Sequence, residues 1–306
     1  MNTLFNFPKD LFKPGMELSG KWNKKSYVII RYIGHGENGS VFLVESSGKQ
    51  YALKITEHSF DLSYEIKMIQ QLSLTQGNHL GFSVFDIDDF VFGEEIYPYY
   101  VMPYRTGITI EQYLTGMRQA DYLYLFSIIV NRLEMLHREG IVFGDLKGEH
   151  IIVDPITLEI SLIDYGGLSL FNESVRQYTV LYDRASWRMG DRRANPHYDF
   201  FSLTLIFIKI AIGENKFKRI FQQSRHVKEL YDIIPNINSL KLLAPVLMKI
   251  LTGKRVSAKI IKRELETIRI KSLSDSKRVK WKWIEWVFSL SFFVFIMMFL
   301  RLLYAL

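Results

Sequence analysis

The stretch Gly140-Ile-Val-Phe-Gly-Asp-Leu-Lys-Gly-Glu-His-Ile-Ile-Val-Asp154 decides the fold of this chain. It contains a carboxylate, Asp145, and a lysine, Lys147, two residues later. A second carboxylate, Asp164, stands before Tyr-Gly after another short run of β-forming residues. Because runs of Ile and Val bounded by turn residues indicate short strands, we expect both carboxylates in loops between strands.

These three side chains suit the transfer of a phosphoryl group from ATP. That reaction needs a base that orients the attacking hydroxyl, a cation near the transferred phosphate and a carboxylate that holds Mg²⁺. Asp145, Lys147 and Asp164 would supply them in that order. An isolated Gly-Asp-Leu-Lys is more often an ordinary turn, so the rest of the chain has to support this interpretation.

The composition excludes several classes of function. The 306 residues are 23% charged and 48% hydrophobic, which describes a globular protein, of one bilobal domain or two ordinary ones, with an unusually apolar segment added. The absence of cysteine excludes disulfide frameworks, thiolate metal sites and cysteine nucleophiles. Residues 1–20 contain no apolar run of signal-peptide length, so we expect this end to stay where it is made.

A glycine-rich motif, Gly34-His-Gly-Glu-Asn-Gly-Ser-Val41, lies between two predicted strands. Gly34, Gly36 and Gly39 would let the backbone approach phosphate oxygens and offer them amide donors. A dinucleotide-binding fingerprint would need a helix directly after the glycines, and a strand is predicted there instead. The motif therefore predicts a loop that covers the phosphates of a nucleotide.

A lysine follows this loop at strand spacing, in Tyr51-Ala-Leu-Lys-Ile. A lysine in a β-run is usually exposed, but after such a glycine loop Lys54 is better interpreted as the ligand of the α- and β-phosphates. Glu65 lies on a helix predicted over residues 62–74. It is either a solvated helix residue or the ion-pair partner that fixes Lys54, in which case formation of the pair would control activity.

The order of the predicted elements favours two unequal lobes. Strands are predicted at 27–33, 41–46, 51–55, 84–87 and 99–102, and helices beyond them at 110–114, 121–138, 199–212, 217–221 and 257–270. A β-rich front and a helical back indicate an α+β, bilobal fold with a crevice near residues 102–107. The segment 200–212 is short and carries Lys209, so we expect a buried core helix there, not a membrane span.

In this order, the motifs resemble those of the eukaryotic-type (Hanks) serine/threonine protein kinases. Asp199-Phe-Phe-Ser-Leu is similar to the family's Asp-x-x-Ser-x-Gly helix, and Lys254-Arg255-Val-Ser-Ala to its late Arg-Pro-Ser-Ala signature. The resemblance spans roughly residues 26–268 and is greatest to the small membrane-anchored kinases of Gram-positive bacteria. It implies a protein-kinase-like fold, ATP with Mg²⁺ or Mn²⁺ as cofactors, and protein substrates.

The resemblance also implies a role for each site residue. Asp145 would be the catalytic base, Lys147 would neutralise phosphate charge, and Asp164 would hold the metal. Met102 would lie at the back of the adenine pocket, and the backbone of Pro103 and Tyr104 would contact the edge of the base. The apolar walls of that pocket would come from Val41, Ala52 and Leu53.

Four positions depart from the family pattern. His150 replaces an asparagine that helps to hold the metal, and we still assign it to the metal site, although imidazole suits Mg²⁺ poorly and is tolerable for Mn²⁺. Phe143-Gly144 replaces His-Arg before the catalytic Asp, so we expect activity that does not depend on loop phosphorylation through this position. No Ala-Pro-Glu is recognisable, which leaves Arg255 without its usual glutamate unless Asp191 substitutes. Pro103 replaces an acidic hinge residue.

The C-terminal residues are expected to form a single membrane anchor. Residues 286–300 carry no charge, but as a helix they cover about 22 Å, short of the roughly 30 Å hydrocarbon core. Continuing past Arg301 to the end of the chain supplies the missing length, and Trp281, Trp283 and Trp286 would mark the opposite boundary. A buried C-terminal helix is the alternative, and the absence of a polar stripe argues against it.

The region 249–282 carries twelve Lys or Arg against three acids. Since positive residues stay cytoplasmic, we expect a cell-membrane protein whose kinase domain faces the cytoplasm. The same region could hold an anionic lipid membrane or, non-specifically, DNA, or only set topology. A homodimer is left open. The expected parts are an N-terminal extension (1–25), an N-lobe (26–104), a C-lobe (105–270), a basic linker (271–283) and a transmembrane helix (284–306).

Three functions are compatible with these observations. The first is a membrane-tethered, ATP-dependent serine/threonine protein kinase, with Ser169, Ser174 and Thr179 as candidate autophosphorylation sites. The second is a weak or inactive pseudokinase that acts as a membrane scaffold or nucleotide-binding module, which His150 and the missing Ala-Pro-Glu favour. The third is a small-molecule phosphotransferase, which only the glycine before Asp145 suggests.

Overall fold

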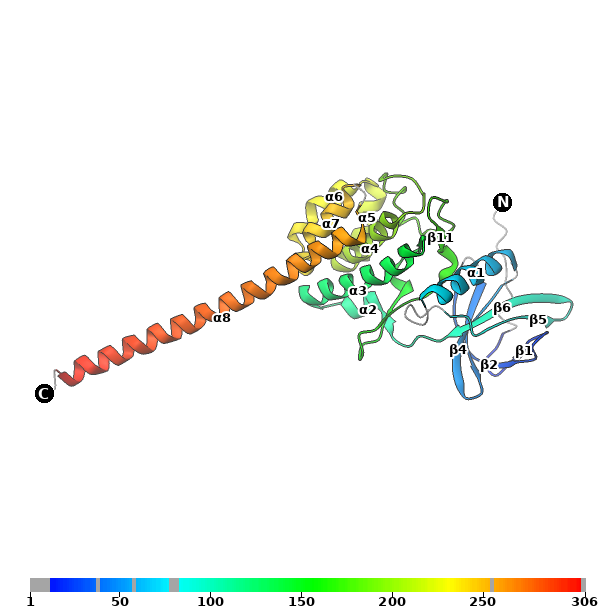
Figure 1. The fold of residues 1–306 in the computed structure, drawn as a ribbon, viewed down its shortest axis with the longest axis horizontal. Coiled ribbons are helices and arrows are strands. Elements are labelled where there is room, and N and C mark those ends of the chain that lie inside the picture. The colour runs from blue at the N-terminus through cyan, green and yellow to red at the C-terminus, as the bar shows by residue number, and fades with distance from the viewer. Residues whose placement is uncertain (1–11, 37–38, 57–58, 77–82, 254–255, 304–306) are drawn as a thin grey trace. The chain divides into compact units, whose positions relative to one another are not determined.

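The computed structural model describes residues 12–36, 39–56, 59–76, 83–253 and 256–303. The chain divides into two compact units, Met1–Ala258 and Lys259–Leu306. In the first unit a β-rich half is followed by a helical half, in agreement with the bilobal fold expected from the sequence (Figure 1).

The described part of the N-terminal half contains a six-stranded antiparallel sheet with strand order β1-β2-β3-β4-β6-β5. Its strands are β1 (Glu17–Ser19), β2 (Ser26–Gly36), β3 (Gly39–Ser46), β4 (Lys49–Ile55), β5 (Asp86–Phe92) and β6 (Glu95–Pro103). Helix α1 (Ser59–Gln76) follows β4 in the chain and contacts β6 (Figure 1). The strand predicted at 84–87 begins and ends later, because the hairpin turn between β5 and β6 is made at Gly93, with a φ of 64°.

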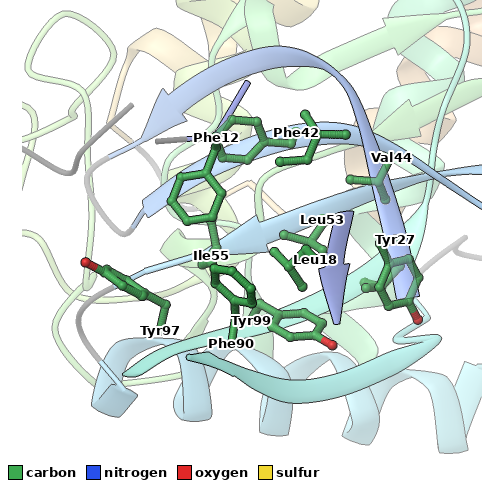
Figure 2. Close-up of a cluster of buried hydrophobic side chains, with 12 residues drawn as sticks. Phe12, Leu18, Tyr27, Phe42, Val44, Leu53, Ile55, Phe90, Tyr97 and Tyr99 are labelled. Carbon is green, nitrogen blue, oxygen red and sulfur yellow. The ribbon is translucent and has the colours of Figure 1, made fainter. Parts of the chain in front are cut away.

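One face of this sheet carries a hydrophobic core (Figure 2). Side chains alternate between the two faces of a strand, and two alternate residues from each of β2, β3 and β4 enter the core: Tyr27, Ile29, Phe42, Val44, Leu53 and Ile55. The ring of Phe12 lies 5.4 Å from that of Phe42, and Leu18 of β1 is fully buried. The segment before residue 26, expected from the sequence to be an extension, therefore contributes a strand and core residues to the N-lobe.

The described C-terminal half of the first unit is mainly helical (Figure 1). Its helices are α2 (Ile110–Leu114), α3 (Gln119–Arg138), α4 (Pro196–Ile212), α5 (Glu214–Gln223), α6 (Val227–Ile233) and α7 (Ala244–Leu251), with 3₁₀ turns at Gly148–His150, Tyr165–Gly167, Ile234–Asn236 and Asn238–Leu240. Short strands between the helices are β7 (Ile108–Thr109), β8 (Ile141–Val142), β9 (Ile151–Val153), β10 (Ile160–Leu162) and β11 (Ser169–Leu170). These strands form a three-stranded sheet in the order β10-β9-β7 and a two-stranded sheet in the order β11-β8.

Helix α4 runs through the centre of the helical half. Every residue from His197 to Lys209 is buried, which confirms that this segment is a core helix. The sequence did not predict α6 and α7. Helix α6 buries only Val227 and Leu230, so its apolar residues are too few to define a helical period.

The described part of the second unit belongs to helix α8 (Ala258–Leu303), which is continuous through residues 271–283, where a linker was expected (Figure 1). The side chains from Trp286 to Met298 are exposed, Phe288 by 71%. Among the residues that the structure describes, no helix combines the length and the apolar character needed to cross a membrane. The transmembrane anchor therefore stays a prediction from the sequence.

Candidate active site

A cleft of about 1080 Å³ lies between the sheet and the helical half. That volume is sufficient for a nucleotide. Ten of the residues selected from the sequence line it: Gly34, Gly36, Val41, Ala52, Lys54, Met102, Tyr104, Lys147, His150 and Asp164. Three more, Gly39, Glu65 and Asp145, are not part of the lining but contact it: Gly39 pairs with Gly36, Glu65 with Lys54 and Asp145 with Lys147. The structure therefore brings these thirteen residues together.

The glycine motif forms the end of the β2–β3 hairpin. Gly39 has a φ of 129°, and a Cβ there would lie 2.4 Å from the carbonyl oxygen of Ile55, so only glycine fits. A Cβ on Gly36 would lie 3.3 Å from Oδ2 of Asp164, which places the hairpin over that carboxylate. A Cβ added to Gly34 would meet nothing within 4 Å, and Gly34 lines the cleft. Residues 37 and 38, at the tip of the motif, lie outside the described residues.

The proposed adenine pocket has apolar walls from two paired strands. Ala52 of β4 is the register partner of Met102 of β6, and both line the cleft. Leu53 does not, because its side chain points to the opposite face of β4 and packs in the core. The expectation that Leu53 forms a pocket wall was therefore wrong. At the mouth, the Tyr104 hydroxyl accepts a hydrogen bond from Arg31 at 3.0 Å.

Lys54 is the centre of the charged network. Its ammonium group donates to the two carboxylate oxygens of Glu65 at 3.0 and 2.9 Å and to Oδ1 of Asp164 at 3.1 Å. Burial alone would lower the pKa of Lys54, but the two carboxylates outweigh burial and raise this pKa. The ion pair predicted between Lys54 and Glu65 is thus present, with Lys54 charged.

Tyr100, from β6, completes this network and was missed by the sequence analysis. Its hydroxyl donates to Glu65 Oε1 at 2.8 Å. Burial, and then the charge of Glu65, raise the pKa of Tyr100 well above its ordinary value, so it remains a neutral donor. Tyr100 is the register partner of Lys54, and a sequence-based prediction of the β4–β6 pairing would have identified it.

Asp145 and Lys147 occupy the loop after β8. Oδ1 of Asp145 accepts a hydrogen bond from Oγ1 of Thr179 at 2.8 Å, while Oδ2 lies 3.6 Å from Nζ of Lys147. Thr179 was selected from the sequence only as a modification site. Because Thr179 fixes one carboxylate oxygen of Asp145, the other remains to orient an acceptor hydroxyl beside a cation.

The catalytic loop is held by helix α4. The carboxylate of Asp199 accepts hydrogen bonds from the backbone amides of Phe143 at 2.8 Å and Gly144 at 3.0 Å. Its Oδ2 also lies 2.8 Å from Nε2 of His137. Asp199 is fully buried, so these charge-assisted bonds position the backbone directly before Asp145.

Asp164 and His150 form the candidate metal site. Nδ1 of His150 lies 2.8 Å from the backbone oxygen of Asp145, and because a carbonyl only accepts, Nδ1 carries the proton. Nε2 of the same ring lies 3.3 Å from Oδ2 of Asp164. Burial would raise the pKa of Asp164, but Lys54 and then His150 outweigh burial and hold it well below its ordinary value. The carboxylate is ionised, as a metal ligand must be.

These two side chains fit a metal that is shared with a nucleotide. Among the described residues, no group of three or more His, Cys, Asp or Glu side chains could hold a metal ion by itself. Mg²⁺ at phosphate-transfer sites is usually held by one or two carboxylates together with substrate phosphates. Asp164 would be the main protein ligand, with His150 beside it.

The segment 168–195 folds around a buried carboxylate, Asp183. It accepts hydrogen bonds from Ser186 and, at 2.8 Å, from Tyr198, and pairs with Arg192 at 2.9 Å. Burial would raise the pKa of Asp183, but these partners lower it below its ordinary value. Asp191, considered from the sequence as the partner of Arg255, lies 3.2 Å from Arg184. Residues 254 and 255 lie outside the described part of the chain.

The bilobal fold and the charged network in its cleft are typical of a protein kinase, and the comparison with known families leads to the same class. The chain matches the family described as "Protein kinase domain" over residues 27–277. The chain therefore belongs to the protein kinase family, as its resemblance to the Hanks-type kinases predicted.

The relatives are serine/threonine kinases. The chain is 31% identical to the serine/threonine-protein kinase YabT of Bacillus subtilis over 83% of its own length and 74% of that protein. It is 28% identical to serine/threonine-protein kinase PrkC of the same organism, over 49% of this chain and 24% of PrkC. The probable serine/threonine-protein kinase PknB of Lactococcus lactis is 22% identical, over 74% of this chain and 38% of PknB. The chain is therefore a serine/threonine protein kinase of the bacterial type.

Solved structures agree on the fold. The structure of vaccinia related kinase 3 superposes with a TM-score of 0.61 at 14% identity, covering 86% of this chain and 92% of that one. The Cydia pomonella granulovirus kinase PK-1 gives a TM-score of 0.59 at 17% identity, covering 77% and 92%. At such identities the likeness extends to the fold alone.

Proposed function

We propose that this protein transfers the terminal phosphoryl group of ATP to serine or threonine hydroxyls of other proteins. The observation that carries the proposal is the position of Lys54, bonded to both Glu65 and Asp164 on the wall of the cleft that also holds Lys147. Family membership supports the reaction class, and this arrangement supports an active conformation of this chain.

Each residue would contribute to one step. Lys54 would bind the α- and β-phosphates, and Asp164 and His150 would hold the divalent ion that neutralises phosphate charge. Asp145 Oδ2 would orient the acceptor hydroxyl and take its proton as the new oxygen–phosphorus bond forms and the bond to ADP breaks. Lys147 would stabilise charge on the transferred group.

The direct test is transfer from labelled ATP by the full chain in detergent, with Mg²⁺ or Mn²⁺ and a basic test protein. Asp145→Asn should reduce the rate by about 10²- to 10⁴-fold, the usual contribution of a general base. Equal transfer by the wild type and Asp145→Asn, or none by either, would reject the proposal.

A pseudokinase that acts as a scaffold is the second candidate, because His150 lies only 3.3 Å from Asp164, where an oxygen ligand would suit Mg²⁺ better. The variant His150→Asn separates the two functions. A slow enzyme should become faster and need less Mg²⁺, since asparagine offers an oxygen. In a scaffold without activity, the same change should leave transfer undetectable while nucleotide binding is retained. Membership of the protein kinase family disfavours the third candidate, a small-molecule phosphotransferase.

We also propose that the chain is tethered to the cell membrane with its kinase domain in the cytoplasm. The support is the uncharged run 286–300 and the basic region 249–282 before it. Expressed in a Gram-positive host, the full chain should sediment with membranes and resist carbonate extraction, whereas a chain ending at residue 285 should not. Release of the full chain by carbonate would contradict the tether.

The basic region supports two further partners, anionic lipid and DNA. Either contact would be made through backbone or headgroup phosphates and would weaken steeply as salt rises. Retention of the chain ending at residue 285 on duplex DNA and on phosphatidylserine vesicles, compared at low and moderate salt, tests both. Binding that does not change with salt would contradict both contacts. A homodimer stays a prediction that sedimentation of the full chain would test.

A further inference from the structure

The position before Asp145 has no room for a side chain. Gly144 has a φ of 80°, and a Cβ there would lie 2.3 Å from the carbonyl oxygen of Gly167 and 3.3 Å from Cγ1 of Val175. The first distance is far below any real contact. An arginine at this position, through which related kinases recognise a phosphorylated activation loop, therefore cannot be accommodated in this backbone.

An arginine is supplied from a different place, beside Val175. Arg176 reaches helix α1, where its NH2 group lies 2.9 Å from Oδ1 of Asp61. Its guanidinium carbon stands 3.9 Å from the centre of the Tyr64 ring. The side chain of Arg176 is 28% exposed. Its contact with α1 combines an ion pair to Asp61 with a cation–π interaction on Tyr64.

The backbone of Arg176 is fixed as well. Its amide donates to Oγ of Ser169 at 3.0 Å, and that hydroxyl donates to the carbonyl oxygen of Gly167 at 2.9 Å. Ser169 is fully buried. Arg176 therefore connects the segment that begins at Asp164 with the first turns of α1.

The same turns of α1 carry Glu65. Asp61 and Glu65 are four residues apart and lie on neighbouring positions of one helical face, and Tyr64 directly precedes Glu65. A contact that holds Asp61 and Tyr64 therefore also limits the movement of Glu65 away from Lys54. A partly exposed ion pair alone contributes little to stability, but a small free energy is enough to shift an equilibrium between two positions of a helix.

We propose that Arg176 is a positioning residue that holds α1 inward, so that the Lys54–Glu65 pair forms without phosphorylation of the activation segment. This inference rests on the proposed kinase function. Two of the candidate phosphorylation sites make contacts within the fold: Ser169 is buried, and the Thr179 hydroxyl donates a hydrogen bond to Asp145. The activation segment thus supplies the positive charge that contacts α1, the guanidinium group of Arg176.

The test uses the full chain and two readouts. Arg176→Met should lower kcat roughly tenfold, because a smaller fraction of molecules has α1 inward. Asp61→Asn should cause a similar loss, and the double variant should be no slower than the slower single variant. Arg138→Met, which removes an exposed ion pair with Glu134 on α3, is the matched control and should leave the rate unchanged.

The second readout does not need catalysis. Amide hydrogen exchange in α1 should become faster in Arg176→Met than in the wild type, while the unfolding temperature changes little. Phosphatase-treated wild type should keep its activity. Wild-type transfer with an unaffected Arg176→Met and unchanged α1 exchange would overturn the inference, as would loss of activity on phosphatase treatment. Absence of transfer by the wild type would instead reject the kinase function, and the exchange comparison would still decide whether Arg176 holds α1.

Discussion

At Lys54, one ammonium group satisfies two carboxylates that come from different elements. Its side chain is 3% exposed and that of Glu65 is 1% exposed, so water cannot replace a lost partner at either group. The charges are therefore interdependent: each carboxylate keeps Lys54 protonated, and Lys54 keeps Asp164 ionised. The site's electrostatics depend on this residue more than on any single hydrogen bond.

This dependence predicts the response of Lys54→Met to pH. The variant should abolish transfer and unfold at lower urea, with a stability loss of about 3–5 kcal/mol at neutral pH, the usual result of breaking a buried pair. The pKa of Asp164 is well below its ordinary value of 3.8 in the folded wild type. Its contribution to stability is therefore fully present above pH 3.8 and is lost as the pH falls through the lower pKa of the folded state. The pKa of Lys54 is raised in the folded state. Lys54 therefore contributes stability below pH 10.5, its ordinary value, and this contribution is lost only as the pH rises through the higher pKa of the folded state.

Without Lys54, protonation of the remaining buried carboxylates stabilises the folded state of the variant. The difference in urea midpoint between the wild type and Lys54→Met should therefore narrow from about pH 7 to about pH 4. Lys49→Met, at the exposed start of the same strand, should match the wild type at every pH. A difference that stays constant with pH would contradict the assigned coupling.

At the scale of elements, helix α4 is both core and anchor. Its residues from His197 to Lys209 are buried, and near its N-terminus Asp199 binds the loop that carries Asp145. Its other end carries a buried lysine, Lys209, which pairs with Glu111 of α2 at 2.8 Å. The helix therefore fixes the catalytic loop from inside the helical half.

This predicts that Asp199→Asn damages both stability and activity. An amide can offer only one oxygen to three donors, and its NH₂ group would face at least one of them. We expect a loss of about 2–4 kcal/mol in unfolding free energy, from weakened charge-assisted bonds and an unsatisfied donor, with a lower kcat at nearly unchanged KM for ATP. Denaturant unfolding and steady-state kinetics check this result. Asp232→Asn on the exposed side of α6 is the control, and equal behaviour of the two variants would argue against the anchoring role.

At the scale of the whole molecule, the sequence predicted those features that lie in continuous motifs. Asp145 and Lys147 share one loop, and the glycines and Lys54 belong to adjacent strands, so local spacing was sufficient. Strand parity alone could have excluded Leu53, since Ala52 and Lys54 share the opposite face of β4.

Other parts of the site depend on tertiary register. Tyr100 meets Glu65 only because β6 pairs with β4, and Arg176 meets Asp61 across 115 residues of chain. Nothing in the local sequence around these residues indicates such contacts. The strand β1 was missed for a related reason: three residues are too few to show a period, and their position is set by pairing with β2.

The last prediction concerns the coupling of the two halves by nucleotide. Lys54 comes from the sheet, whereas Asp164 and His150 come from the helical half, so a metal–nucleotide complex in the cleft would contact both. Binding to the folded state alone raises its stability, by about 2.7 kcal/mol at a ligand concentration one hundred times the Kd. ADP with Mn²⁺ should therefore raise the unfolding temperature of the full chain more than ADP with EDTA. Asp164→Ala should lose the metal-dependent part, whereas Asp145→Asn should keep it, because Asp145 acts on the acceptor hydroxyl. If Mn²⁺ adds nothing in the wild type, or adds equally in Asp164→Ala, then Asp164 does not hold the metal.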